Sequence, residues 1–503
     1  MRLRLSIAVV SAVLLVPLVG AAAELQAGVA KVEITDHAFG PVHDSSFVKA
    51  LVIKDGNTTA VLITVDAVAI GEIGRIGNGY LPSVRAQLQK ELGIPPASVF
   101  INASHCHSIV RADTDVLTVQ AVKTAWQNLA PVKVGAGVAH VDRISENRRL
   151  KLKDGSEADM RRAYSMPRDE DVASVGPIDP QIGLLRIDRA NGQPLAVIYN
   201  FACHPILNPP NTGNTADFPG FASKAIEENL GHGALAFFVQ GCCGDINPVR
   251  YKAVTQPHSA EHLGNQLGLS ILRTVRQIET KPDGLLRTSN EVIALPHGTD
   301  LDRRMTAIQT EQAKLLQSLK PTDINFKTFL PLLLQQRLSP EFPSFYAQGY
   351  LHEKSLGRDD LTRLDATNRA SVEAYLSNIQ IMEKLTRLNT NLALLTKHQA
   401  QNIAAGKPTF DVEIGGLRIG DFQLVTFPGE LTVEIGLGIK KRAPSSHSFV
   451  AGYTNGYIYY LPTAQQRGNT GFAQEDCDCI VGPEWQKLFE QRADAVLQKL
   501  AAP

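Results

Sequence analysis

The stretch Ser98–Ser108 reads SVFINASHCHS and joins an apolar run to a pair of histidines. The run Val99–Ile101 consists of β-branched and aromatic residues, which predicts a short buried strand. Side chains two positions apart on an extended chain project to the same side, so His105 and His107 should face one pocket. Two imidazoles at the end of a rigid strand are typical ligands of a transition metal. Such a spacing alone is weak evidence, and the rest of the chain has to support it.

The segments on both sides of this stretch alternate between strand-like and helix-like patterns. Strands are predicted at Ala50–Ile53 and Ala60–Val65, and a helix is predicted over 81–92. Two further apolar runs, Leu195–Phe201 and Leu235–Gln240, have the length and composition of buried strands. The sequence therefore predicts an α/β fold, with a multi-strand sheet core and flanking helices.

Candidate metal ligands follow three separate predicted strands. His204 comes directly after Leu195–Phe201, and Glu430 follows the strand-like run Phe422–Phe427, much as His105 follows its own strand. Strand ends are where α/β sheets usually place their sites. Two imidazoles and one carboxylate around Zn²⁺ would leave a position open for water, whose pKa falls towards 7. From these residues alone, a backbone-bonded buried His204 and an exposed Glu430 after a Pro-Gly turn remain alternatives.

The sequence changes character in two regions. Residues from about 300 to 405 have long helical periodicity and many Gln, Lys, Thr and Leu, which predicts a mostly helical insertion packed on or over the sheet. A surface that binds a partner protein is the alternative for this insertion. The charged segment 142–180 is predicted mainly as a solvated loop.

The N-terminus has the features of a secretory signal peptide. It has a basic start, an apolar core over 5–19 and small residues at 20–23. We therefore expect residues 1–23 to be removed, leaving 24–503 as one catalytic domain of a secreted or periplasmic protein. The apolar run falls short of the roughly 20 residues that span a bilayer, so no transmembrane anchor is expected to remain.

The overall charge is balanced. Lys plus Arg and Asp plus Glu both total 50, so the formal net charge is zero. This balance gives no indication of binding to nucleic acid or of general attraction to an anionic membrane. It says nothing about the oligomeric state.

A series of motifs runs through nearly the whole mature chain. They are AGVAKVEIT at 27–35, SHCHS at 104–108, Asn147-Arg148, FACHP at 201–205, DFPGFA at 217–222, GDINP at 244–248, PGE at 428–430 and NGYIYYLPT at 455–463. In order and spacing, these motifs resemble the catalytic region of the neutral/alkaline ceramidase family. Members of that family are zinc amidases that cleave the N-acyl bond of ceramide.

This resemblance implies a metal site and a reaction. His105, His204, Glu430 and Tyr460 would be the zinc ligands, and metal-activated water would hydrolyse the amide bond of a lipid substrate. His107 would lie beside the metal and polarise the carbonyl or pass protons.

Three more site residues are implied by the resemblance. Arg148 would bind an oxygen of the substrate or intermediate, and Tyr457 would contribute a hydrogen bond unless it belongs to the aromatic core. Asn247 stands where ceramidases carry an active-site serine before proline. An amide can orient a substrate through hydrogen bonds but cannot act as a hydroxyl nucleophile.

These departures leave three hypotheses open. The first is a ceramidase-like amidase, and the second is a zinc hydrolase for another amide or an ester, since Asn247 replaces the serine. The third is a secreted binding protein that keeps the fold with little catalysis. The chain is also expected to lack the additional C-terminal β domain of full-length ceramidases, so access to lipid could differ.

The six cysteines fall in segments that border the implied site. Cys242 and Cys243 lie in the loop of Asn247, and Cys477 and Cys479 follow the Tyr460 segment. In an oxidising compartment we expect a disulfide between these two loops, since both should approach the metal. A second metal site is the alternative. Cys106 and Cys203 are expected to point into the core behind the site.

Overall fold

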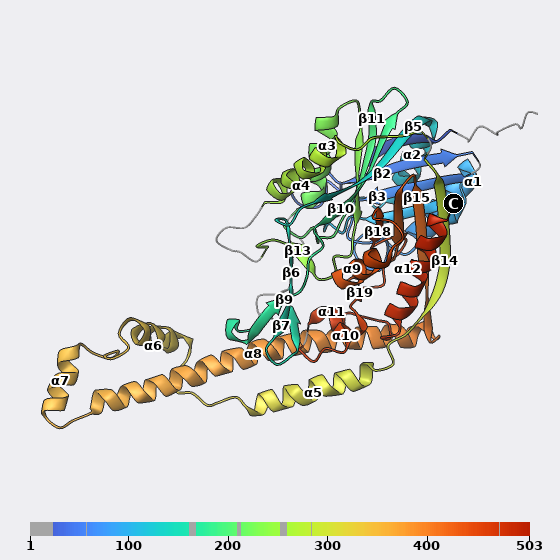
Figure 1. Cartoon of the computed structure of the whole chain (residues 1–503). Coiled ribbons are helices and arrows are strands. Elements are labelled where there is room, and N and C mark those ends of the chain that lie inside the picture. The colour runs from blue at the N-terminus through green and yellow to red at the C-terminus, as the bar shows by residue number, and fades with distance from the viewer. Residues whose placement is uncertain are drawn as a thin grey trace, which may run out of the picture.

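An eight-stranded sheet lies at the centre of the computed structural model, in the order β12-β11-β10-β5-β1-β2-β3-β4 (Figure 1). The structure describes residues 24–56, 58–159, 167–208, 213–251, 259–282, 284–471 and 473–502, so the predicted signal peptide at 1–23 lies outside the described residues. The strands are β1 (Gln26–Glu33), β2 (Phe47–Asp55), β3 (Thr58–Val65), β4 (Val99–Ala103), β5 (Ala130–His140), β10 (Gln181–Arg189), β11 (Pro194–Phe201) and β12 (Leu235–Gln240). The β3–β4 and β11–β12 pairs are parallel, and the other neighbours in this sheet are antiparallel.

The sheet curls until its two edge strands, β4 and β12, come into contact. The backbone N–H of Gln240, at the end of β12, donates a hydrogen bond of 2.9 Å to the side-chain oxygen of Asn102 on β4. Strand twist accumulates across many strands, and here it brings opposite edges together. As a result, the carboxyl ends of β4 and β11 come together on either side of the end of β12.

Helices and a second sheet cover the two faces of this central sheet. One face carries α1 (Tyr80–Leu92), α2 (Thr114–Gln127), α3 (Asp217–Leu230) and α4 (Ala260–Val275). The other carries a four-stranded sheet of β14 (Leu286–Pro296), β15 (Thr409–Ile419), β16 (Phe422–Thr426) and β18 (Ser448–Ala451), itself covered by α9 (Val433–Arg442) and α12 (Trp485–Ala501). The predicted α/β fold with flanking helices is confirmed.

The alternating side chains of a single strand show why these runs are apolar throughout. On β2, Leu51 and Ile53 belong to the core between the two sheets, whereas Val48, Ala50 and Val52 belong to the core under the helices. Successive side chains of a strand point to opposite faces, so a strand buried on both faces needs an unbroken apolar sequence.

The segment predicted mainly as a solvated loop, 142–180, contains short strands, so the loop prediction is wrong where they form. Many of its charged side chains, such as Lys151 and Glu170, are nevertheless exposed, as predicted. Strand β6 (Ser145–Asn147) pairs with β13 (Ile246–Pro248), and β7 (Arg149–Leu152), β8 (Glu157–Asp159) and β9 (Val172–Val175) form a small sheet. The charges misled the prediction because Arg148 and Arg149 are buried and neutralised by Glu475 and Asp476. Residues 160–166 lie outside the described residues.

The insertion predicted at about 300–405 is helical, but it extends away from the sheets as an arm (Figure 1). It consists of α5 (Leu301–Gln317), α6 (Phe326–Leu338), α7 (Ala347–Ser355) and α8 (Asp360–Ala405). The expectation that it packs on the sheet is wrong. Buried side chains of α5 and α8, such as Ile308 and Leu388, form a small core of their own together with Cys477 of α11 (Gln474–Cys477). No helix among the described residues combines the length and apolarity needed to cross a bilayer.

Candidate metal centre

Three buried side chains converge where the strand ends meet. His105 follows β4, His204 follows β11, and Glu430 begins β17 (Glu430–Leu431). One potential ligand atom from each of these residues lies within 4.8 Å of the other two, so the cluster could hold a metal ion. The three residues predicted from strand ends are therefore brought together.

Gln240 holds the two histidine segments at this distance. Its side-chain Nε2 donates one hydrogen bond to the carbonyl of Ser104 and another to the carbonyl of Cys203, each at 3.0 Å. Ser104 directly precedes His105, and Cys203 directly precedes His204. One buried amide thus connects the backbones that carry both imidazoles.

The hydrogen bonds of the two imidazoles fix which nitrogen faces the carboxylate. His105 Nδ1 lies 2.6 Å from the carbonyl oxygen of Val68, and His204 Nδ1 lies 3.0 Å from that of Ile246. A carbonyl only accepts, so each Nδ1 carries the proton and each neutral ring presents an unprotonated Nε2.

These Nε2 atoms lie beside the carboxylate of Glu430. The distances are 3.1 Å from His204 Nε2 to Oε2 and 3.6 Å from His105 Nε2 to Oε1. Two lone pairs this close to a carboxylate repel it unless a cation lies between them. The arrangement therefore suits a metal ion.

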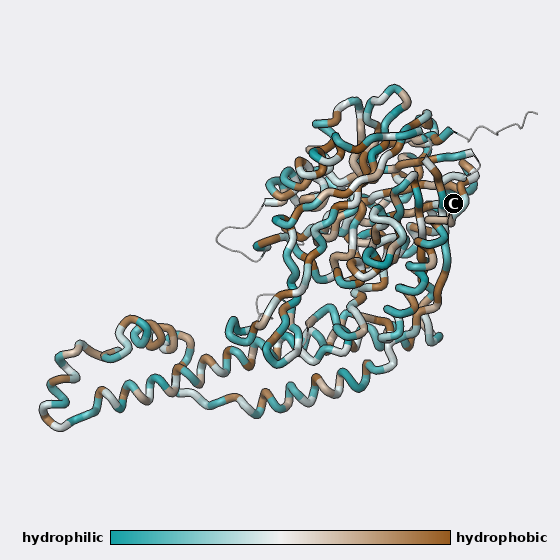
Figure 2. Tube along the Cα trace, in the orientation of Figure 1, coloured by the Kyte–Doolittle hydropathy of each residue, from teal (hydrophilic) through white to brown (hydrophobic). Residues whose placement is uncertain are grey.

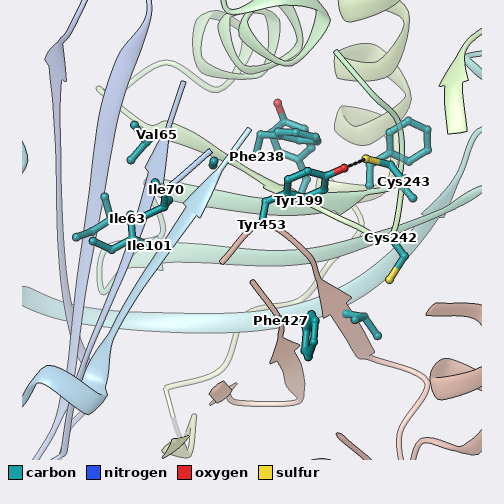
Figure 3. Close-up of a cluster of buried hydrophobic side chains, with 14 of the residues drawn as sticks. Ile63, Val65, Ile70, Ile101, Tyr199, Phe238, Cys242, Cys243, Phe427 and Tyr453 are labelled. Atoms are coloured by element: carbon teal, nitrogen blue, oxygen red, sulfur yellow. Dashed lines mark hydrogen bonds between the residues drawn. The ribbon is translucent and has the colours of Figure 1, made fainter. Parts of the chain in front are cut away.

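Two tyrosine hydroxyls orient Glu430. Tyr457 donates to Oε1, and Tyr453 donates to Oε2 at 3.1 Å. The Tyr453 hydroxyl also lies 3.1 Å from the sulfur of Cys243 (Figure 3). Tyr457 was a predicted site residue, whereas Tyr453 was missed. Its only sequence signal is its position two residues before the NGYIYYLPT motif.

Burial and mutual contact set the charges of the cluster. Burial raises the pKa of the Glu430 carboxyl. The positive charge that the two histidines carry when they are protonated at low pH, together with the Tyr457 hydroxyl, outweighs burial and holds the pKa well below its usual value. Burial lowers the pKa of His105 to about 4 and also lowers that of His204. Near pH 7 the cluster is thus one carboxylate with two neutral imidazoles, which is the form that binds a cation.

Arg148 lies beside this cluster and is held entirely by protein groups. Its Nε donates to Glu475 at 2.7 Å, its Nη1 to the side-chain oxygen of Asn247 at 3.1 Å, and its Nη2 to the carbonyl of Gly244 at 2.6 Å and the hydroxyl of Tyr460 at 3.2 Å. Burial disfavours the charge, but Glu475 outweighs it and raises the pKa of Arg148. Glu475 was missed because it lies 327 residues from its partner, and no motif marks it.

The remaining predicted residues surround the same point. Tyr460 begins β19 (Tyr460–Leu461), which pairs with β17 so that Tyr460 lies opposite Glu430. Its ring stacks on His204 with centroids 6.4 Å apart. The half-buried ring of His107 meets His105 edge to face at 5.7 Å. Every predicted site residue therefore lies in or next to the cluster, while their individual roles remain predictions.

The backbone around the cluster is strained. His105, Tyr453, Asn455 and Tyr459 have φ angles of 69°, 51°, 59° and 64°. Residues with a Cβ rarely adopt this left-handed region, which costs on the order of 1–3 kcal/mol per residue and is often found at functional sites.

The cysteines do not form the expected disulfide, because all six are buried free thiols. The two loops place their sulfurs in separate surroundings. In the first loop, Cys242 lies beside Gly436 of α9, and the sulfur of Cys243 contacts the hydroxyl of Tyr453. In the second loop, the sulfur of Cys477 contacts Arg304 of α5, and that of Cys479 contacts the carbonyl of Val481. Cys106 and Cys203 are fully buried beside the histidines, as expected.

Comparison with known proteins identifies the fold of this chain but not a sequence family. No protein-family model matches the chain, and no curated protein matches its sequence. Among solved structures, neutral ceramidase from Pseudomonas aeruginosa superposes with a TM-score of 0.58 at 17% identity, covering 96% of this chain and 76% of that chain. The structure of a ceramidase complexed with C2 superposes with a TM-score of 0.58 at 17% identity, covering 95% of this chain and 76% of that chain. The chain has the neutral ceramidase fold, as its motifs predicted.

Proposed function

We propose that this chain, which has the fold of neutral ceramidase, is an exported zinc-dependent hydrolase that cleaves the N-acyl amide bond of a ceramide-like lipid. One observation carries the proposal: two unprotonated imidazole nitrogens face one carboxylate at 3.1 and 3.6 Å, which calls for a cation between them. Export is supported by the signal-like N-terminus.

The ligand set suits zinc. His105, His204 and Glu430 would hold the ion, and Tyr460 is proposed as a fourth ligand. Each of the first three already has an outer partner, namely the carbonyls of Val68 and Ile246 for the histidines and two tyrosine hydroxyls for Glu430. When bound, Zn²⁺ would activate water and polarise the amide carbonyl.

The neighbouring residues would position the substrate. Arg148 is proposed to place its positive charge where the carbonyl oxygen becomes negative, and Glu475 and Asn247 fix its guanidinium in advance. A charge held in place needs no reorganisation during the reaction. His107, half-buried beside His105, is proposed to move the proton to the leaving nitrogen.

Asn247 supports a second candidate, a zinc hydrolase acting on another amide or on an ester. Its side-chain oxygen accepts from Arg148, so it orients the guanidinium but supplies no nucleophile or proton relay. A substrate that depends on the serine of ceramidases would be cleaved slowly. A binding protein without catalysis is the third candidate.

The test is metal analysis combined with hydrolysis of fluorogenic amides and esters that carry acyl chains of several lengths. We expect about one equivalent of zinc per chain and cleavage of a long-chain N-acyl amide. His204→Ala should lose most of the zinc and the activity, while His140→Ala, at an exposed position on β5, should retain both. Zinc below about half an equivalent, or activity that survives His204→Ala, would refute the proposal.

A further inference from the structure

Helix α6, on the part of the arm that extends from the body, exposes an apolar stripe. Phe326, Leu330, Leu334 and Leu338 recur at every fourth position and are 66%, 45%, 51% and 84% exposed. Residues four apart lie on one face of a helix, so the four side chains form a continuous ridge. Figure 2 shows the apolar character of this helix at the far part of the arm.

The aromatic contact that holds α6 to the arm lies outside this stripe. An adjoining face packs on α8 through Phe329, whose ring stacks on that of Tyr375 with centroids 4.6 Å apart. The start of α6 is fixed by a capping box between Asn325 and Thr328. The helix is therefore already formed and anchored, and its outer face is available to something else.

The charges on α6 indicate what that face meets. Lys327 and Arg337, both exposed, are its only charged residues, and it has no acidic side chain. Each cation is three residues from a leucine of the stripe, so both project from its side of the helix, one near each end. Long Lys and Arg side chains in such positions can reach lipid headgroups while the Phe and Leu side chains enter the apolar layer. Two copies of α6 packed face to face would instead bring like charges together.

We propose that α6 docks the arm onto an anionic lipid surface, with the stripe inserted between the acyl chains and Lys327 and Arg337 at the headgroups. In one respect this inference rests on the proposed function, because a ceramide-like substrate resides in a bilayer. The net charge of zero gives no indication of general attraction to an anionic membrane, but it is compatible with this local one.

The test is sedimentation of the full chain with vesicles of phosphatidylcholine, alone or with about one-third phosphatidylserine. We expect binding to the mixed vesicles, weakened about tenfold or more by Leu334→Asp combined with Leu338→Asp. Lys327→Gln with Arg337→Gln should remove the preference for phosphatidylserine. The matched control is Leu488→Asp on α12, which is 38% exposed and should bind normally. Leu338→Asp alone, at the most exposed position of the stripe, should fold normally and still weaken binding, so the proposal can be tested even if the double variant misfolds.

Two outcomes would overturn the proposal. One is a wild-type chain that sediments with neither kind of vesicle, and the other is vesicle binding that the α6 variants leave unchanged. Self-association that is abolished by the leucine variants, without vesicle binding, would assign the stripe to a second copy of the chain. His204→Ala separates the two proposals, because it should lose hydrolysis and still bind vesicles.

Discussion

The side-chain amide of Gln240 donates a hydrogen bond to the backbone carbonyl of Ser104 at 3.0 Å, across the closed edge of the central sheet. The same nitrogen donates to Cys203. Because both carbonyls directly precede a histidine of the cluster, the position of the imidazoles depends on how the sheet closes.

Gln240→Leu should therefore weaken both fold and site. The substitution leaves two buried carbonyls without this donor, which should lower the free energy of unfolding by about 2–4 kcal/mol. Zinc affinity should fall as well. Urea unfolding and metal titration measure the two effects, with the exposed Gln277→Leu as the control. A stable variant with unchanged zinc affinity would show that the bridge is dispensable.

Tyr453→Phe should lower metal affinity while leaving the fold intact. It removes the donor to Glu430 Oε2 at 3.1 Å, and the loss of such an outer-shell partner typically costs about 10- to 100-fold in affinity. Tyr457→Phe should behave in the same way. The control is Tyr199→Phe, whose buried hydroxyl bonds to Ser223 and Pro219 instead. Equal affinity in all three variants would contradict this role.

Asp217 should make the chain less stable as pH rises. Burial raises the pKa of this carboxyl to about 6, so between its unfolded pKa of 3.8 and about 6 the folded state binds more protons. The stabilisation is therefore fully present below pH 3.8 and is lost as pH rises through about 6. The free energy of unfolding falls by no more than about 3 kcal/mol over this range.

Asp217→Asn should remove this pH dependence, since an amide resembles the protonated acid. Urea unfolding at several pH values should show that the free energy of unfolding of the variant rises relative to that of the wild type between pH about 4 and 7. Asp142→Asn, at an exposed position, is the control. A constant difference across this range would mean that Asp217 does not titrate there.

A thiol assay should find six free cysteines per chain after denaturation without reductant. In the native protein all six should react slowly, because burial raises the pKa of every one. A linked peptide joining Cys242 or Cys243 to Cys477 or Cys479 would restore the disulfide predicted from the sequence.

Local patterns predicted the elements of the sheet well. The apolar runs at Ala60–Val65 and Leu235–Gln240 form strands that are buried on both faces. Such a strand needs apolar residues at consecutive positions, so its sequence is recognisable locally. The same patterns failed for Arg148 and Arg149. A charged pair indicates exposure unless its counterions are known, and these lie 327 residues away.

By itself, the sequence determined that His105, His204 and Glu430 each follow a strand, because the periodicity that encodes a strand is local. Only the tertiary structure decided that these strand ends meet, that Tyr453 and Glu475 join them, and that the cysteines stay apart. It also decided that the insertion extends as an arm. Those outcomes depend on sheet curvature and on contacts between distant residues, which no local pattern contains.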